Sequence, residues 1–263
     1  MIAGGKNNLI GISGKIGSGK DTVGKILQLI ASNGDLGVYK TDLDFLGGGD
    51  YILEKCSNYQ TKKFAGKLKD IACLLIGCTR EQLEDRDFKE KELGEEWSKE
   101  LWYCVADDGS YVPYEQNLHE HKVVDIVKLT PRKLLQLLGT EAGRQIIHPN
   151  IWVNALFADY KGKYLGATDD MKNPVEMCFP NWIITDVRFP NEVQAIKDRG
   201  GIVIRVNRPL ERLGNSKLPK LKHTSITQHP SETALDNYNF DYVIENEGSI
   251  DELVQKIKQL KLV

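Results

Sequence analysis

Short apolar runs alternate with amphipathic stretches along the whole chain. Four runs have the continuous hydrophobic character of strands buried on both faces, and they cover residues 9–13, 182–186, 202–206 and 241–245. A weaker strand signal lies at residues 38–39. Apolar residues recur at helical spacing between the runs. We therefore expect right-handed crossovers and a mainly parallel sheet covered by helices on both faces.

Capping residues indicate where several helices begin. Thr130 before Pro131 is a typical N-cap followed by proline at the first helical position. Ser249 with Glu252 three residues later has the pattern of a capping box. Helices are expected up to residue 33 after the first strand, over 64–76, from 130 toward 139, from 148 onward, from 190 to 200 and after 249.

The region before residue 130 has a different character. Residues 81–100 hold nine acids and four bases with little apolar content, which predicts a solvated helical face or surface excursion. Residues 101–105 and 111–114 flank an Asp-Gly turn and predict a β-hairpin. Such a hairpin between helices indicates an insert, so we expect a single domain over residues 1–263.

Composition narrows the class of protein. Hydrophobic residues make up 41% and charged residues 27% of the chain, as in soluble globular proteins. A net charge of -2 argues against stable nucleic-acid binding. The five cysteines form no C-x-x-C pair, and neither a signal peptide nor an apolar run of membrane-spanning length is evident. We therefore expect a cytoplasmic protein with reduced thiols and no membrane association.

The strongest motif follows the first predicted strand. Gly14, four further residues, Gly19 and Lys20 stand between that strand and a helix, as in a phosphate-binding P-loop. Glycines let backbone N–H groups turn toward phosphate oxygens, and the helix N-terminus adds positive potential. A chance glycine-rich turn is the alternative, and its position after a buried strand disfavours it. The expected ATP-phosphate ligands are Lys15, Gly17, Ser18, Gly19, Lys20, Asp21 and Thr22.

One position departs from the general motif. The residue after the lysine is usually Ser or Thr, whose hydroxyl holds Mg²⁺, whereas this chain has Asp21. A carboxylate can serve a magnesium ion directly or through water. Alternatively, Asp21 only caps the helix, favoured there by the helix dipole.

Two residues at and after the end of the strand predicted at 182–186 are candidates for the reaction centre. Asp186 falls at the carboxyl end of the strand, where open α/β sheets bind ligands, and Arg188 follows two residues later. Asp186 is a candidate metal ligand, and its alternative role is to cap the helix that begins at Pro190. Arg188 is a candidate catalytic cation or an ordinary surface arginine.

Further candidates could receive the phosphate acceptor. If the helix after Pro131 continues, Thr140 and Arg144 lie on one face, and Arg144 could clamp a phosphate with two hydrogen bonds. A surface arginine is the alternative on spacing alone. Lys63 and Phe64 offer a cation and an aromatic ring just before a helix. Trp152 is either a core residue or a residue at the border of the acceptor site.

Residues 199–222 form a basic segment with seven Lys or Arg and one acid. A solvated loop is one interpretation. A basic loop between the last two strands of a P-loop fold is also where a lid would close over ATP, and Arg208 and Arg212 are its candidate ligands.

Taken together, four motifs resemble the deoxynucleoside monophosphate kinases of tailed bacteriophages. They are G-K-D-T at 19–22, L-Q-L-L-G-T-E at 135–141 with Arg144 and Trp152, T-D-V-R-F-P-N-E at 185–192, and H-P-S-E at 229–232. Aspartate after the P-loop lysine belongs to this family's pattern. The likeness extends over the chain except residues 80–127.

The resemblance implies a three-layer P-loop kinase fold of the α/β class with a parallel central sheet, an acceptor-binding insert at about 50–150 and a lid at about 207–231. The implied reaction is ATP plus dNMP to ADP plus dNDP with Mg²⁺, in the host cytoplasm if the protein is viral. Asp21 and Asp186 would hold the metal, Lys20, Asp186 and Arg188 would act at the reaction centre, and Asn246 would touch adenine. The implied acceptor ligands are Lys63, Phe64, Gln136, Thr140, Glu141, Arg144 and Trp152.

Two other readings of the residues stay open. A kinase for dephospho-coenzyme A or a nucleoside would share the P-loop without requiring Arg144 as a phosphate clamp. A nucleotide-binding regulator would bind ATP without turnover. The accepted bases and the oligomeric state are not specified, and a homodimer is one option.

Overall fold

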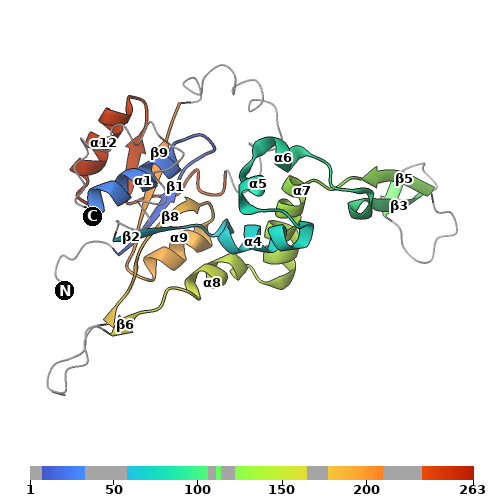
Figure 1. The fold of residues 1–263 in the computed structure, drawn as a ribbon, viewed down its shortest axis with the longest axis horizontal. Coiled ribbons are helices and arrows are strands. Elements are labelled where there is room, and N and C mark those ends of the chain that lie inside the picture. The colour runs from blue at the N-terminus through green and yellow to red at the C-terminus, as the bar shows by residue number, and fades with distance from the viewer. Residues whose placement is uncertain (1–7, 33–57, 106–110, 114–121, 165–176, 210–232) are drawn as a thin grey trace. The chain divides into compact units, whose positions relative to one another are not determined.

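The structure is a computed structural model that describes residues 8–32, 58–105, 111–113, 122–164, 177–209 and 233–263 (Figure 1). The chain divides into two compact units, Met1–Gly66 with Trp152–Val263 and Lys67–Ile151. The expected arrangement of one domain with an insert stays a prediction. The expected strand at 38–39 lies outside the described residues.

A five-stranded sheet forms the centre of the first unit. Its order is β10-β9-β1-β8-β2, and every neighbouring pair is parallel. The strands are β1 (Leu9–Ser13), β2 (Tyr59–Lys62), β8 (Asn181–Val187), β9 (Ile202–Asn207) and β10 (Tyr242–Glu245). Four of the five were predicted as apolar runs, and the parallel sheet is confirmed. A short antiparallel ribbon, β6 (Lys163–Tyr164) with β7 (Met177–Cys178), also belongs to this unit.

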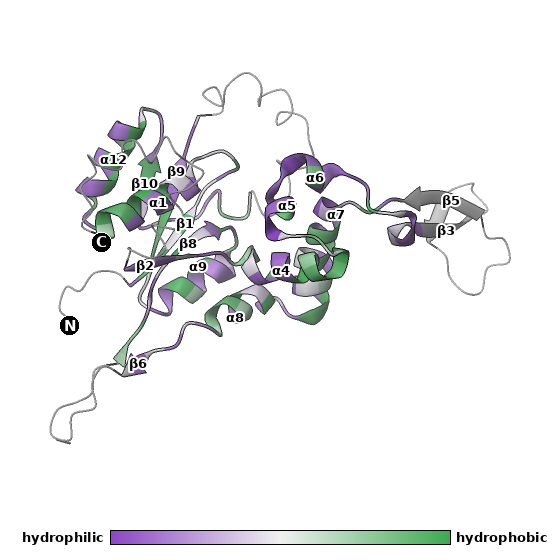
Figure 2. Ribbon diagram, viewed as in Figure 1, coloured by the Kyte–Doolittle hydropathy of each residue, from purple (hydrophilic) through white to green (hydrophobic). Residues whose placement is uncertain are grey.

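Helices pack on both faces of this sheet, so the first unit has three layers. Ile10 and Ile12 point into a core shared with α1 (Lys20–Ala31) and α12 (Ile250–Gln259). Leu9 points the other way, into a core shared with α8 (Ile151–Phe157) and α9 (Pro190–Lys197). Apolar and polar residues alternate around α12 in Figure 2, as an amphipathic helix requires. The α/β fold class is confirmed.

The strand order places one edge of the sheet for ligand binding. β1 lies between β8 and β9, and its last residue, Ser13, pairs with Val187 on one side and Arg205 on the other. β8 and β2 therefore lie on one side of β1, and β9 and β10 lie on the other, so the strand order changes direction at β1. In open α/β sheets, ligands bind at the carboxyl edge at this point, and the predicted P-loop follows β1 there.

α1 packs unusually close to β8 at one residue. A Cβ built on Gly24 would lie 2.7 Å from Cγ2 of Thr185, closer than real side-chain atoms approach. Glycine at this position therefore sets the distance between the helix that follows the P-loop and the neighbouring strand.

The second unit combines short helices with a small antiparallel sheet. Its elements are the greater part of α4 (Ala65–Ile76), then α5 (Arg80–Glu84), α6 (Arg86–Glu90), η1 (Glu95–Trp97), β3 (Lys99–Val105), β4 (Tyr111–Pro113), β5 (Lys122–Val127), α7 (Pro131–Gln136) and η2 (Leu137–Ile147). Ala72, Leu83 and Leu134 form its buried core. The predicted hairpin is confirmed as β3 with β4, and β5 is a third strand that was not predicted.

Two expected helix boundaries differ from the structure. Thr130 caps α7 as predicted, since its side chain accepts from the Lys133 N–H at 3.2 Å. The helix does not end near Gly139 but continues as a wider π-helix to Ile147. The next helix begins at Ile151, three residues later than expected, because His148 is extended and its Nδ1 accepts from the Asn150 N–H.

Within the described residues, none of the helices combines the length and the hydrophobicity that crossing a lipid bilayer requires.

Candidate phosphate-binding site

The turn after β1 has the geometry of an anion-binding loop. Gly17 and Gly19 have φ angles of 79° and 92°, the left-handed region that glycine favours, and Ser18 N–H donates to the Lys15 carbonyl. The hydroxyl of Ser18 is buried and has no hydrogen-bond partner among the described residues. Such a hydroxyl requires a partner, and a bound phosphate oxygen would provide one. The Lys20 ammonium meanwhile contacts the Lys15 carbonyl at 3.5 Å, a weak interaction that a phosphate could replace.

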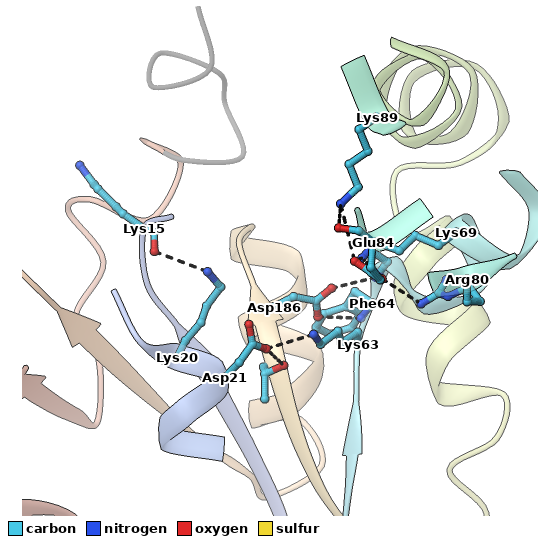
Figure 3. A network of polar contacts seen from close by, with 12 residues as sticks. Lys15, Lys20, Asp21, Lys63, Phe64, Lys69, Arg80, Glu84, Lys89 and Asp186 are labelled. Atoms are coloured by element: carbon cyan, nitrogen blue, oxygen red, sulfur yellow. Dashed lines mark hydrogen bonds and ion pairs between the residues drawn. The ribbon is translucent and has the colours of Figure 1, made fainter. Parts of the chain in front are cut away.

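Asp21 faces two partners from other segments (Figure 3). Its Oδ1 accepts from the Thr185 hydroxyl at 2.9 Å and lies 3.0 Å from the Lys63 ammonium. Burial alone would raise the pKa of Asp21. The charge and hydrogen bond of Lys63, the Thr185 hydroxyl and the charge of Lys20 outweigh it and hold the pKa below its ordinary value of 3.8. Asp21 is therefore a carboxylate at neutral pH.

Asp186 joins β8 to the start of α4. Its two oxygens accept from Phe64 N–H at 2.7 Å and from Ala65 N–H at 2.9 Å, so the carboxylate caps α4. The alternative in which Asp186 caps the helix at Pro190 is wrong. Buried Glu192 does so, since its Oε2 accepts from the N–H of the N-cap residue Phe189 at 3.1 Å.

Asn246, after β10, is hydrogen-bonded to the phosphate loop. Its side-chain N–H donates to the Ser18 carbonyl at 2.9 Å, and a Cβ on Gly19 would lie 2.5 Å from the same nitrogen. Residue 19 must therefore be glycine both for its φ angle and for this close approach. The contact of Asn246 with adenine stays a prediction.

A buried arginine connects the strand ends to the loop. Arg205 on β9 is 9% exposed, and its guanidinium donates to the Ser13 hydroxyl at 3.1 Å and to Asp236 at 3.3 Å. Asp236 in turn pairs with Lys15 of the P-loop at 3.0 Å. None of these contacts was predicted. A charged residue inside the apolar run 202–206 was the available signal, since buried arginines are normally paired.

The remaining predicted residues divide between the two units. In the first unit, Trp152 is 5% exposed, Arg208 is exposed and Arg188 is half-buried, while Arg212 lies outside the described residues. In the second unit the helical stretch from Pro131 to Ile147 carries Gln136, Thr140, Glu141 and Arg144. Glu141 Oε2 is buried and has no partner among the described residues.

The structure thus brings one set of predicted residues together. The P-loop, Lys63, Phe64, Asp186 and Asn246 are linked within the first unit by the contacts above. Thr185, beside Asp21, was not singled out, although alternation along β8 places it on the opposite face from Asp186, toward α1.

Among the described residues, no three His, Cys, Asp or Glu side chains are grouped as a metal cage. Mg²⁺ in nucleotide sites is typically held by one or two carboxylates together with phosphates. The ionised carboxylate of Asp21, at the start of α1, fits that role, and each Asp186 oxygen retains a free lone pair beyond its backbone hydrogen bond.

A three-layer α/β unit with a phosphate loop at the carboxyl edge of its central strand defines the class of P-loop nucleotide-binding proteins. The sequence matches the family model described as deoxynucleotide monophosphate kinase over residues 92–257. The chain therefore belongs to the deoxynucleotide monophosphate kinase family, and the resemblance found in its motifs is confirmed.

Individual relatives have the same character. The deoxynucleoside-5'-monophosphate kinase of Escherichia phage T5 is 29% identical over 250 residues, which are 86% of this chain and 84% of that protein. The deoxynucleotide monophosphate kinase of Enterobacteria phage T4 is 27% identical over 143 residues, 52% of this chain and 50% of that protein. The protein of the same name in Escherichia phage RB69 is 28% identical over 129 residues, 49% of this chain and 43% of that protein.

Proposed function

We propose that this chain transfers the γ-phosphoryl group of ATP to deoxynucleoside monophosphates and releases ADP and deoxynucleoside diphosphates. The observation that carries the proposal is the phosphate loop with its partnerless Ser18 hydroxyl, in a chain of the deoxynucleotide monophosphate kinase family. The substrates are small molecules, and the proposed place of the reaction is the cytoplasm, which is that of the host cell if the protein is viral. Stable nucleic-acid binding is not part of the proposal, and a homodimer is compatible with it.

The donor phosphates bind at the loop. Backbone N–H groups at the start of α1 and the Ser18 hydroxyl donate to the phosphate oxygens, while Lys20 exchanges the Lys15 carbonyl for a phosphate. Asn246 keeps the loop in this shape by its hydrogen bond to Ser18. Lys15, Thr22, Arg208 and Arg212 complete the proposed ATP ligands.

Asp21 and Asp186 are the proposed ligands of Mg²⁺. The metal, when bound, would neutralise charge on the phosphates. Lys63 is already beside Asp21 and adds a second cation at the same edge of the sheet. In this arrangement Asp21 orients both the hydroxyl of Thr185 and the ammonium of Lys63.

No general base is required, because the attacking phosphate oxygen of the acceptor is already anionic. The chain's contribution is positioning and charge. Arg188 and Lys20 are the proposed cations for the developing charge. The acceptor would contact Lys63, Phe64, Gln136, Thr140, Glu141, Arg144 and Trp152.

The proposal is tested by coupled ADP release from Mg-ATP against deoxynucleoside monophosphates, ribonucleoside monophosphates, nucleosides and dephospho-coenzyme A. Turnover is expected with deoxynucleoside monophosphates. Lys20→Ala should abolish turnover while leaving the circular dichroism spectrum unchanged. The matched control is Lys258→Ala on α12, which should keep turnover at the wild-type level. Turnover confined to nucleosides or dephospho-coenzyme A would overturn the substrate assignment. ATP binding without turnover on any acceptor would point to a regulator.

A further inference from the structure

The first unit contains a cavity away from the phosphate loop. Its volume is about 520 Å³, and it is lined by residues of β2, β8 and the segments around the β6–β7 ribbon. Trp182 in its wall pairs with Leu9 at the start of β1, whereas Val187 pairs with Ser13 at the end of β1. Five residues of strand separate these levels, about 16 Å. The wall of the cavity at Trp182 is therefore at the opposite end of the sheet from the P-loop, while Lys62, level with Ile184, lies between the two ends.

Its lining carries an excess of positive charge. Three lysines, Lys62, Lys161 and Lys163, line the cavity together with one acid, Asp159. The Lys62 ammonium lies 5.2 Å from the centre of the Trp182 ring, where it is attracted by the aromatic face. Cations gathered around one hollow repel one another unless an anion joins them, so the lining favours an anionic ligand.

The indole of Trp182 provides an independent sign of a missing partner. Its residue is 2% exposed, and its Nε1 is buried without a hydrogen-bond acceptor among the described residues. Buried indole N–H groups normally find an acceptor, because leaving one unpaired is unfavourable. Trp182 lines the cavity, so a ligand oxygen that reaches this N–H on binding would supply the acceptor.

One wall of the cavity is a flat aromatic surface. Phe179 is 41% exposed, and its ring stacks on Tyr160 at 5.3 Å with an interplanar angle of 21°. Tyr160 in turn packs edge-on against Trp182 at 4.8 Å. The ring of Phe179 is thus fixed by its neighbours while part of it stays open to an aromatic ligand.

We propose that this cavity is a second nucleotide site, separate from the ATP site. A nucleoside phosphate would stack its base on Phe179, place its phosphate between Lys161 and Lys163, and accept a hydrogen bond from Trp182 Nε1. The volume lies within the range of sites for small ligands. Inorganic phosphate shares the lysines but not the stacking surface, so it should bind much more weakly than a nucleotide.

The indole N–H of Trp182 gives a direct measurement. The chain has four tryptophans, so ¹⁵N-tryptophan labelling yields four indole signals, and Trp182→Phe identifies the relevant one. Titration of the full chain with ATP, dATP or dTTP should move this signal saturably, with inorganic phosphate at least tenfold weaker. The shift should persist in Lys20→Ala. A Trp182 signal that stays in place with every nucleotide, or whose shift disappears in Lys20→Ala, would overturn the proposal.

Charge reversal distinguishes the cavity from adventitious binding. The double variant Lys161→Glu, Lys163→Glu should weaken nucleotide binding at least tenfold by the Trp182 signal. Phe179→Ala should weaken nucleotide binding but leave the affinity for inorganic phosphate unchanged. The matched control is Lys258→Glu, Lys261→Glu at the end of the chain, which should bind as the wild type does. If the Lys161→Glu, Lys163→Glu variant bound nucleotide as tightly as this control does, the proposed nucleotide site would be contradicted.

Discussion

At the scale of single residues, the position after the P-loop lysine carries a carboxylate, Asp21, in place of the usual Ser or Thr hydroxyl. The general motif carries Ser or Thr after its lysine, whereas here the hydroxyl beside that position comes from Thr185 on the neighbouring strand, 2.9 Å from Asp21. Asp21 adds a full negative charge, and Lys63 balances it. The site therefore keeps a hydroxyl and gains a carboxylate.

This ion pair should be visible in the pH dependence of stability. The pKa of Asp21 is lower in the folded chain than its ordinary value of 3.8, so its stabilisation is present above about pH 4 and is lost as the pH falls through the folded pKa. Lys63→Met should lower Tm at pH 7 by about 1–3 °C, since partly exposed pairs contribute less than about 1 kcal/mol. The difference from wild type should shrink on acidification from pH 5 to pH 3 in scanning calorimetry. Lys258→Met serves as control, and a difference that is independent of pH would count against the pair.

At the scale of elements, the sequence predicted four strands of the five-stranded sheet and missed the fifth, β2. β2 reads Tyr-Gln-Thr-Lys and is an edge strand with only Tyr59 buried, so it has no apolar run. The sequence also left open whether the helix continues beyond Gly139, which it does. Glycine there predicts a helix end, but Gly139 is buried, and a Cβ on it would lie 3.0 Å from Leu68. It is a packing residue rather than a terminator.

The site was predictable where it is local in sequence and not where it depends on folding. The P-loop spans a few consecutive residues, so its motif was sufficient. The hydrogen bonds of Thr185 to Asp21 and of Arg205 to Ser13 join residues 164 and 192 positions apart. Nothing in composition or spacing specifies such partners, because they depend on strand order and on which face of a strand each side chain occupies.

Asp186 should stabilise α4 as an element. Asp186→Ala removes the acceptor of two N–H groups at the start of α4 and should cost about 2 kcal/mol of unfolding free energy. Asp186→Asn keeps one acceptor oxygen and should cost about half as much. Urea unfolding of the wild type and both variants measures these losses. The control is Asp198→Ala at the exposed residue after α9, which removes a side-chain hydrogen bond from Gln194 but no hydrogen bond to a helix N-terminus. If Asp186→Ala is as stable as that control, the cap is not significant for stability.

At the scale of the whole molecule, the proposed ligands of the two substrates are distributed over two compact units. The P-loop and its neighbours belong to the first unit, and the helical stretch that carries Gln136, Thr140, Glu141 and Arg144 belongs to the second. The proposed acceptor ligands Lys63, Phe64 and Trp152 also belong to the first unit, so substitutions in the second unit are the ones expected to weaken acceptor binding without affecting ATP.

Arg144→Ala should weaken dNMP binding by roughly 10–100-fold, because a hydrogen bond to a charged group contributes about 1.5–3 kcal/mol, and should leave ATP affinity unchanged. Calorimetric titration of each substrate measures both. Arg132→Ala is the matched control, since Arg132 lies on α7 and pairs with Glu90 at 2.5 Å. Parallel loss of ATP and dNMP affinity in Arg144→Ala would remove this residue from the acceptor site.

The close approach of Gly24 to Thr185 has a consequence for how the sequence can change over time. With 2.7 Å between a Cβ at residue 24 and Cγ2 of Thr185, residue 24 can gain a side chain only if residue 185 becomes smaller, and Gly24 has no side chain to lose in exchange for a larger residue 185. Thr185 also holds Asp21, so a larger residue 24 would displace the carboxylate along with the helix. We therefore expect substitutions at residues 24 and 185 to be coupled in evolution, and to be constrained by the hydrogen bond of Thr185 to Asp21 as well as by packing in the core.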